Sequence, residues 1–376
     1  MNKVITATNN LEVKNINKRR VINLLYQQSG MTKQDIARSL DLSIPTVSQI
    51  LKELTERGLM TTAGHLKSTG GRKPMLNALV HDAKFAVGIE ITPHHIRLVL
   101  INLAGNVIAH EYIREKFEHS PEYTQRLSSL CDDFVSKNQM QSDKLLGIGI
   151  AVPGIVQVEK DVIEYLPTLD VKDFPISNLR KYFKIDIKLE NEANLAGLAE
   201  IWCRHYMNDA VFLSVKKGVG GAVIINDQVY AGKNFRAGEF GHMTIIENGK
   251  TCACGKKGCL EAYCSTKVLR EEYNDDLSEF FSRLDNKDEA CIKIWDEYLD
   301  HLATGINNLR MVFDAEVIIG GEIHQFCPTL RNQLNQKLNK LDSFNNTTNY
   351  LHISRHGVMA SAMGAALLCV DEFLNE

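Results

Sequence analysis

The chain has 376 residues, of which 44% are hydrophobic and 24% charged, with a formal net charge of −3. This length allows two or three domains, and the composition is that of an ordinary globular protein. The N-terminal sequence MNKVITATNNLEVKN lacks the apolar region of a signal peptide, and no stretch approaches ~18 uninterrupted apolar residues. We therefore expect a cytoplasmic protein that does not contact a membrane and whose thiols stay reduced.

Charge is unevenly distributed along the chain. Residues 1–80 contain twelve Lys and Arg but only five Asp and Glu, so the remainder of the chain is acidic. A basic N-terminal segment (the head) followed by an acidic remainder (the body) indicates that only the head binds a polyanion such as DNA. Charge by itself leaves open a basic face that is merely solvated.

Residues 18–60 have the pattern of three short helices. Thr32, with Asp35 three residues later, is a capping-box-like start for the second helix. Ser43 caps the third helix, and Pro45 is tolerated in its first turn. Three helices with a tight turn between the second and third predict a helix-turn-helix arrangement.

In that arrangement the early residues of the last helix reach the base edges of DNA. Val47 and Ile50 take the inner face of this helix, so the polar residues around them point outward. The predicted DNA contacts are Ser43, Thr46, Ser48 and Gln49. Gln pairs bidentately with adenine, and Thr touches a thymine methyl group. A small helical domain with no role in nucleic-acid binding is the alternative.

Residues 59–80 have the pattern of a two-stranded wing. The expected strands are 59–62 and 75–79, and the basic sequence STGGRKP lies between them. Arg72 and Lys73 in this sequence suit a narrow minor groove. A basic interdomain linker is the alternative.

From residue 84 the pattern becomes that of an α/β protein. Three consecutive strands are followed by a helix at about 121–138 and by the buried strand LLGIGIAV, which runs into a Pro-Gly turn. Residues 186–202 read as a strand entering a helix, and residues 210–232 begin a second set of strands. The repeated order is one of pattern, not of detectable sequence similarity.

Three cysteines lie within eight positions, at Cys252, Cys254 and Cys259. In a reducing compartment such a cluster indicates a metal site or catalysis rather than a disulfide framework. His242 lies ten residues upstream of the first cysteine, and Cys₃His is a closed tetrahedral set typical of structural zinc. We expect structural zinc on His242, Cys252, Cys254 and Cys259; a redox cluster or inert thiols are the alternatives.

Four motifs resemble those of the ROK family, which joins transcriptional repressors and sugar kinases on one body fold. They are NEAN (191–194), GVGGAVIINDQVYAG (218–232), GEFGH (238–242) and CACGKKGCLE (252–261). The head sequence, followed by GGRKP, is similar to the winged head of ROK repressors. NEAN in place of the usual NDAN is similar to the xylose-responsive branch of the family.

The resemblance implies an α/β fold with a two-lobed actin/hexokinase-like (ribonuclease H-like) body and an N-terminal all-α/winged helix-turn-helix domain. We expect the DNA-binding domain at 1–80 and a first lobe at 81–195, completed by a C-terminal helix at 356–376. The second lobe, 196–355, carries the zinc site and sugar-binding residues. A ligand cleft separates the two lobes.

The same resemblance implies which residues meet a sugar. By position the set is Gly154, Asn191, Glu192, Glu239, His242 and Glu261. Carboxylates and amides suit sugar hydroxyls, which both donate and accept hydrogen bonds. Gly154 lets the backbone approach the ring, and the second ring nitrogen of His242 is free to donate to a sugar oxygen.

The parts that kinases use for phosphoryl transfer are altered. The phosphate loop that ends the first strand in family kinases is here Glu90 to His94 and contains Pro93, which has no N–H. The second phosphate turn reads Lys216-Lys217-Gly218, and the catalytic Asp is replaced by Glu192, whose longer side chain misplaces a base. These changes favour a protein that is not an enzyme.

We therefore expect a repressor of sugar-utilisation genes that binds double-stranded operator DNA and is released by a small sugar inducer. A homodimer, or a dimer of dimers, is expected because helix-turn-helix heads usually read paired half-sites. The alternatives are an active ATP-dependent sugar kinase with an appended head and a repressor controlled by a partner protein. A phosphorylated sugar also stays open, with Lys216 or Lys217 as phosphate partner.

Overall fold

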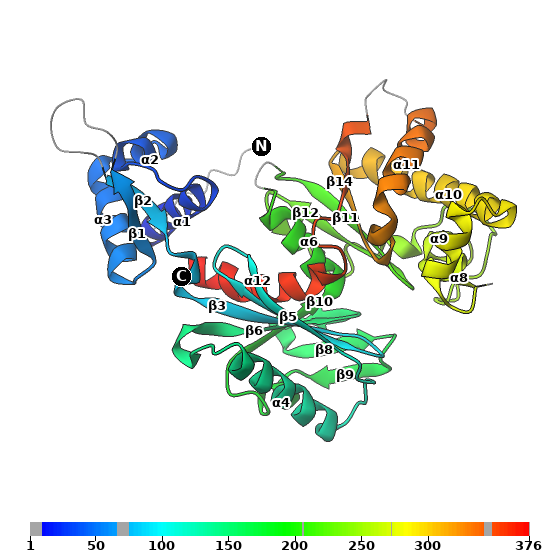
Figure 1. Cartoon of the computed structure of the whole chain (residues 1–376), viewed down its shortest axis with the longest axis horizontal. Coiled ribbons are helices and arrows are strands. Elements are labelled where there is room, and N and C mark those ends of the chain that lie inside the picture. The colour runs from blue at the N-terminus through cyan, green and yellow to red at the C-terminus, as the bar shows by residue number, and fades with distance from the viewer. Residues whose placement is uncertain (1–9, 66–74, 205–206, 272, 342–347, 376) are drawn as a thin grey trace.

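The computed structural model describes residues 10–65, 75–204, 207–271, 273–341 and 348–375. In these ranges a helical head lies beside a body built on two five-stranded sheets (Figure 1). The α/β fold class with a winged helix-turn-helix head, expected from the sequence, is confirmed. The residue boundaries of the domains stay predictions.

The head consists of three helices and a two-stranded antiparallel sheet. Thr32 and Asp35 form the expected capping box, and Ser43 caps the third helix. The first helix begins at Asn10, earlier than the apolar pattern indicated. Arg72 and Lys73 lie outside the described residues. The elements are α1 Asn10–Gln27, α2 Lys33–Leu40, α3 Ile44–Glu56, β1 Met60–His65 and β2 Met75–Leu79.

The first five-stranded sheet has the order β10-β6-β3-β4-β5. Its first three strands in the chain form an antiparallel meander, and the last two pair in parallel. Alternate residues of β3 face opposite sides, so Ile89 and Ile91 meet α4 while Glu90 faces away from it. The elements are β3 Phe85–Ile91, β4 Ile96–Asn102, β5 Val107–Ile113, α4 Pro121–Lys137, β6 Leu145–Val152, β10 Ile187–Asn191 and α6 Glu192–Trp202.

The second five-stranded sheet repeats this topology with the order β13-β12-β11-β14-β15. Again three antiparallel strands are followed by two parallel ones. The pattern-level duplication expected from the sequence therefore has a structural counterpart. The strands are β11 Ala210–Val215, β12 Val219–Ile225, β13 Gln228–Val229, β14 Glu316–Gly321 and β15 Leu351–Ile353.

A three-stranded antiparallel sheet and several helices complete the body. The sheet covers the apolar face of the first lobe, and the long helix α10 packs in the core of the second. The strands are β7 Ile155–Gln157, β8 Val162–Leu166 and β9 Val171–Pro175. The helices are α5 Ser177–Arg180, α7 Glu261–Cys264, α8 Thr266–Arg270, α9 Leu277–Asp285, α10 Glu289–Phe313 and α11 Cys327–Leu341.

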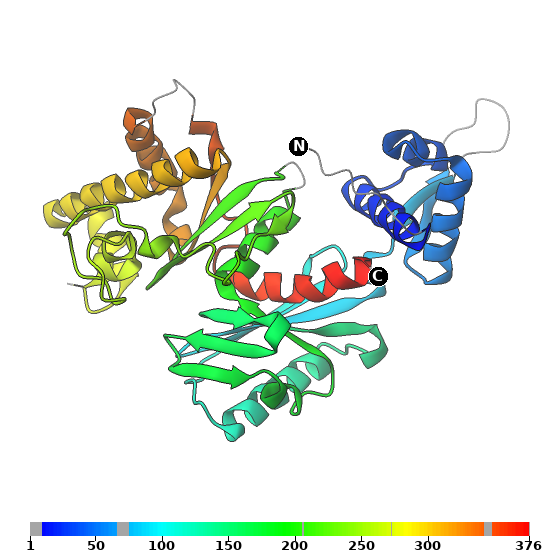
Figure 2. The same ribbon diagram turned by 180° about the vertical axis from the view of Figure 1, so that it is seen from behind.

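The last helix, α12 (Ala360–Asn375), lies between the first sheet and α6, as the opposite views show (Figures 1 and 2). The fit is close: a Cβ added at Gly88 would lie 1.8 Å from the carbonyl oxygen of Ala362. Residues Gly357–Leu374 are long and apolar enough to cross a membrane by length and composition, yet 67% of them are buried inside the protein. Burial in the core accounts for their apolar composition.

Head and body share one apolar cluster. Val21, Ile22 and Leu25 of α1 belong to the same buried cluster as Leu103 and Leu374 of the body. At the end of α3, the guanidinium of Arg57 lies 5.1 Å from the ring centre of Phe373 in α12, a distance suited to a cation–π contact. The head is thus packed against the body, and a movement of the body can reach it through direct contacts.

Candidate functional site

The start of α3 holds the predicted base contacts. Ser43 accepts a hydrogen bond from the backbone N–H of Thr46, and its Oγ lies 2.8 Å from Thr46 Oγ1. Gln49 is exposed, whereas Thr46 and Ser48 are half-buried. Gln49 therefore offers the longest free polar side chain of the set, because the two capping hydroxyls already bond to each other.

Ile44, the first residue of α3, is a further candidate for base contact that the sequence pattern did not indicate. Its side chain is 50% exposed beside Ser43. Its spacing from Val47 and Leu51 would place it on the buried face of the helix, so only the structure reveals that it is exposed. Such a side chain suits contact with a thymine methyl group.

Asn191 and Gly154 meet at the junction of β10 and α6. The side chain of Asn191 caps α6 by accepting hydrogen bonds from the N–H groups of Ala193 and Asn194, at 2.8 and 3.1 Å. Its Nδ2 donates to the carbonyl oxygen of Gly154 at 2.8 Å. Gly154 has φ +157° and a Cβ there would lie 2.2 Å from the carbonyl oxygen of Tyr165, so a side chain does not fit.

Lys216 links the two five-stranded sheets. It follows β11 of the second sheet, and its Nζ lies 2.9 Å from Oε1 of Glu90 in β3 and 2.8 Å from Oε2 of Glu192 at the start of α6. Arg97 of β4 pairs with the other oxygen of Glu90. The sequence indicated Lys216 as part of an altered phosphate turn and, in one alternative, as a phosphate partner, but not as a link between the sheets.

These four side chains form a formally neutral cluster. Burial by itself would raise the pKa of Glu90, but the charges of Lys216 and Arg97 hold it below its usual value. Burial would lower the pKa of Lys216, but the carboxylates of Glu192 and Glu90 raise it above the ordinary lysine value. Glu90 and Lys216 thus stay charged at neutral pH.

Glu239, His242 and Glu261 gather around the cysteine loop. Nε2 of His242 lies 3.9 Å from Oε2 of Glu239, too far for a direct hydrogen bond. Oε2 of Glu261 accepts a hydrogen bond from the backbone N–H of Val219 at 2.9 Å. Val219 directly follows the turn that carries Lys216. This turn therefore contacts both Glu192, through Lys216, and Glu261, through the N–H of Val219.

The four predicted metal ligands come together. The ligand atoms of His242, Cys252, Cys254 and Cys259 all lie within 4.8 Å of one another, with Nδ1 of His242 3.7 Å from the sulfur of Cys252. This spacing and this Cys₃His donor set fit one tetrahedral ion. If Nδ1 binds the ion, Nε2 is left to face Glu239. Residues 238–242 and the cysteine loop thus form a centre that can hold a metal.

Helix α6 connects the predicted sugar residues to the head. It begins at Glu192 and ends at Trp202, whose Nε1 donates to the hydroxyl of Tyr26 in α1 at 2.7 Å. That hydroxyl in turn donates to the carbonyl oxygen of Ala104. Burial raises the pKa of Tyr26 to about 12, so the phenol stays protonated and keeps this bond. Sequence reasoning gave no sign of this contact.

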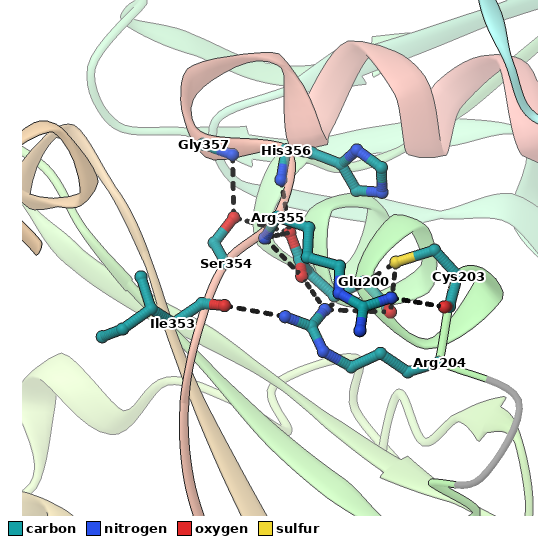
Figure 3. A network of polar contacts seen from close by, with 8 residues as sticks. All are labelled: Glu200, Cys203, Arg204, Ile353, Ser354, Arg355, His356 and Gly357. Carbon is teal, nitrogen blue, oxygen red and sulfur yellow. Dashed lines mark hydrogen bonds and ion pairs between the residues drawn. The ribbon is translucent and has the colours of Figure 1, made fainter. Parts of the chain in front are cut away.

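A buried carboxylate fixes the far end of α6 (Figure 3). Glu200 is fully buried, and its carboxylate accepts from the guanidinium of Arg204, the hydroxyl of Ser354 and the backbone N–H groups of Arg355 and His356. Although burial would raise the pKa of Glu200, the charge of Arg204 and these hydrogen bonds lower it. The end of α6 and the residues that lead into α12 therefore behave as one unit.

Comparisons with protein families agree with this geometry. A family model described as "ROK family" matches residues 86–372, and one described as "Winged helix-turn-helix DNA-binding" matches residues 14–59. The chain is 28% identical to a xylose repressor of Caldicellulosiruptor bescii, over 98% of each protein.

Solved structures show the same body fold with and without a head. A ROK family transcriptional regulator, described as a homologue of the E. coli MLC protein, aligns with a TM-score of 0.80 and 20% identity over 96% of this chain and 97% of that one. A ROK hexokinase from Thermus thermophilus aligns with a TM-score of 0.66 and 23% identity, over 78% of this chain and all of its own.

Proposed function

The chain belongs to the ROK family and carries a DNA-binding head, and from this we propose that it is a transcriptional repressor whose body binds a sugar. The relative from Caldicellulosiruptor bescii, alike over nearly its whole length, is named a xylose repressor, so xylose is the first candidate effector. The repressor represses sugar-utilisation genes until the sugar releases it from the operator.

The ion pairs of Lys216 and Lys217 are the observation that carries the proposal of a neutral sugar in a body that does not transfer phosphate. Lys216 is bound between Glu90 and Glu192, and Lys217 pairs with Asp275. Both lysines of the former phosphate turn are thus neutralised by the chain's own carboxylates, and Pro93 has no N–H to offer a phosphate. The site therefore favours a neutral sugar over a sugar phosphate, and it does not support phosphoryl transfer.

The sugar is held by polar groups from both sheets. Asn191, Glu192, Glu239 and Glu261 supply acceptors for its hydroxyls, and the turn at Gly154 lets the backbone come close. Nε2 of His242 and Oε2 of Glu239 are separated by 3.9 Å, a gap that one hydroxyl can bridge by accepting from the first and donating to the second. Since Lys216 fixes one oxygen of Glu192, the other is left for the sugar.

Zinc is the metal that we assign to His242, Cys252, Cys254 and Cys259. Its role is structural, because four protein ligands leave no open position. The ion would hold the cysteine loop, which leads into Glu261, against the turn that carries Glu239. It would thereby fix the positions of both carboxylates in the proposed sugar site. Bound zinc supplies rigidity here and no chemistry.

On the DNA side, the start of α3 enters the major groove of the operator. Gln49 and Thr46 read base edges and Ile44 packs on a thymine methyl, while Ser43 holds the helix start and Ser48 lines its flank. Arg72 and Lys73 of the wing contact the backbone or the minor groove. The protein acts in the cytoplasm as a homodimer or a dimer of dimers, so that two heads meet paired half-sites.

Helix α6 carries the sugar signal to the head. Its eleven residues span roughly 16 Å as a helix. The sugar contacts Glu192 at one end, while Trp202 at the other end holds Tyr26 of the head. A sugar that binds two orientations of α6 with different affinity shifts the population of DNA-competent heads.

Calorimetric titration with a panel of sugars tests the proposal. We expect heat from a neutral pentose or hexose, xylose first, and none from the corresponding sugar phosphates or from ATP. Binding of ATP with formation of a sugar phosphate would show an active kinase instead. No heat with any sugar would favour a repressor controlled by a partner protein.

A further inference from the structure

A further ion pair joins the two lobes in addition to the contacts of Lys216. Nη2 of Arg236 lies 3.3 Å from Oε1 of Glu164. Glu164 belongs to β8 of the first lobe, whereas Arg236 lies in residues 230–238, which follow β13 of the second lobe. The other oxygen of Glu164 accepts a hydrogen bond from Nε2 of Gln157 in β7, so this carboxylate is held in place from its own side.

Both partners of this ion pair lie beside proposed sugar contacts. Tyr165, the residue after Glu164, pairs with β7, which begins directly after Gly154. A Cβ placed on Gly154 would lie 2.2 Å from the carbonyl oxygen of Tyr165. On the other side, Arg236 precedes Glu239 by three residues. The ion pair therefore ties the strand that backs the Gly154 turn to the segment that leads into Glu239.

Residues 231–237 form a small closed loop that contains a strained residue. The N–H of Ala237 donates to the carbonyl oxygen of Ala231 at 3.1 Å, and the N–H of Phe235 donates to that of Gly232 at 3.3 Å. Phe235 has φ +55° and is the one aromatic residue with positive φ in the part of the chain that the structure describes. This backbone conformation is unfavourable for a bulky side chain. It persists only where neighbouring contacts hold it, and it is typical of ligand clamps and switch segments.

The ion pair of Arg236 with Glu164 is weak enough to open. The two side chains are 62% and 26% exposed, and an exposed ion pair contributes little stability because water and salt screen it. Lys216 is only 23% exposed and binds two carboxylates, so it is the stronger connection. When the outer pair opens, Phe235 can return to an ordinary backbone conformation and the loop can leave the first lobe, while the contacts of Lys216 remain.

We propose that residues 230–238 are a lid over the sugar site and that the ion pair of Arg236 with Glu164 is its latch. This inference rests on the proposed sugar-binding function and assigns to the same site the step that controls exchange of the sugar. Arg236 and Glu164 are positioning residues, which hold the lid without touching the sugar. Because the latch must open both for entry and for release, its loss speeds both steps and leaves the affinity nearly unchanged.

Hydrogen exchange in the full-length protein tests the latch without any sugar. Glu164→Gln removes the charge but keeps the shape of the side chain and an acceptor for Gln157. We expect residues 230–238, in the other lobe, to exchange about two- to fivefold faster, as suits the loss of one exposed ion pair. Asp161→Asn is the matched control, because Asp161 lies in the turn before β8 but pairs with Arg180 of its own lobe. It should leave the exchange of residues 230–238 unchanged.

Stopped-flow kinetics test the lid, with the sugar that the calorimetric panel identifies. Glu164→Gln should raise the association and dissociation rate constants alike, by about two- to fivefold, while the dissociation constant stays within about twofold. Arg236→Met removes the latch from the second lobe and should give the same result. Asp161→Asn should change neither rate constant.

The proposal is overturned if residues 230–238 exchange equally fast in Glu164→Gln and in the unaltered protein, or if Asp161→Asn speeds their exchange as much. It is also overturned if Glu164→Gln weakens the affinity through the dissociation rate alone, because Glu164 would then bind the sugar itself. A protein that binds no sugar would contradict the proposed function, and the exchange measurement would still decide whether the latch exists.

Discussion

At the scale of single residues, Lys216 is the side chain that links the two five-stranded sheets. From the sequence alone it was part of an altered phosphate turn and, in one alternative, a partner for the phosphate of a sugar phosphate. The structure gives it a role, because its ammonium lies within 2.9 Å of carboxylates from two different segments. A sequence pattern cannot show such a contact, since Glu90 and Glu192 approach Lys216 only once both sheets have formed.

Lys216→Met should therefore weaken binding of the neutral sugar by at least tenfold, or about 1.4 kcal/mol. Without the ammonium, Glu192 is no longer held and Glu90 keeps only Arg97 as a cationic partner. Lys217→Met is the matched control, because its partner Asp275 is largely exposed and a surface pair contributes little. Calorimetry compares the two variants, and equal affinities would remove Lys216 from the sugar site.

Among the predicted DNA contacts at the start of α3, the hydroxyls of Ser43 and Thr46 bond to each other, whereas the amide of Gln49 is available for a base. Gln49→Ala should cost about 1–3 kcal/mol in binding to the operator, with little loss on random DNA, because an amide pair to a base carries sequence information. Fluorescence anisotropy with both DNAs at one salt concentration measures this difference. Equal losses on both DNAs would assign Gln49 to the phosphate backbone instead.

At the scale of elements, helix α6 runs from Glu192, a proposed sugar contact, to Trp202, which is hydrogen-bonded to the DNA-binding head. Much of the body was predictable, because strands such as β3 and β6 are continuous apolar runs and β10 leads directly into α6. The three-stranded sheet was missed, since β8 and β9 are short and interrupted by charged residues. Helix α10 was also missed, although Trp295, Leu299, Leu302 and Ile306 give it an apolar stripe that was available in the sequence.

Trp202→Phe should uncouple the head from the sugar site. The ring is kept, but the N–H that binds the Tyr26 hydroxyl is lost. We expect sugar affinity to remain within about twofold and the sugar-dependent loss of operator affinity to shrink by several-fold, a size typical of allosteric coupling. Trp295→Phe, which removes an indole N–H bound to Gln333 in the second lobe, is the control and should leave the coupling intact.

Glu200→Gln should destabilise the protein by about 3 kcal/mol, because it leaves the buried guanidinium of Arg204 without its charge partner. The equivalent surface pair, Glu279 with Arg283, has the same helical spacing, and Glu279→Gln should cost less than about 1 kcal/mol. Chemical denaturation measures both. A Glu200→Gln variant as stable as the Glu279→Gln one would show that the network in Figure 3 does not anchor α6.

The pH dependence of stability follows from the lowered pKa of Glu200. A carboxyl whose pKa is lower in the folded state stabilises the protein above its unfolded value of about 4.3, and this stabilisation is lost as the pH falls through the folded value. The difference in stability between the unaltered protein and Glu200→Gln should therefore narrow below about pH 4.

At the scale of the whole molecule, a DNA-binding head is joined to a ROK family body whose phosphoryl-transfer parts are altered. The shared apolar cluster and the Trp202–Tyr26 hydrogen bond make the head part of the same packed structure as the body. The ROK resemblance in the sequence was enough to indicate both parts. The contact between them depends on side chains far apart in the chain, so only the structure reveals it.

Coupling between sugar and operator must be reciprocal. If the sugar weakens operator binding by a given factor, the operator weakens sugar binding by the same factor. The most direct measurement is therefore operator binding by fluorescence anisotropy at increasing concentrations of xylose and of the other neutral sugars. We expect one neutral sugar to raise the operator dissociation constant by at least about fivefold, with no ATP required. An operator affinity that stays constant with every sugar, or that changes only when ATP is also present, would contradict it.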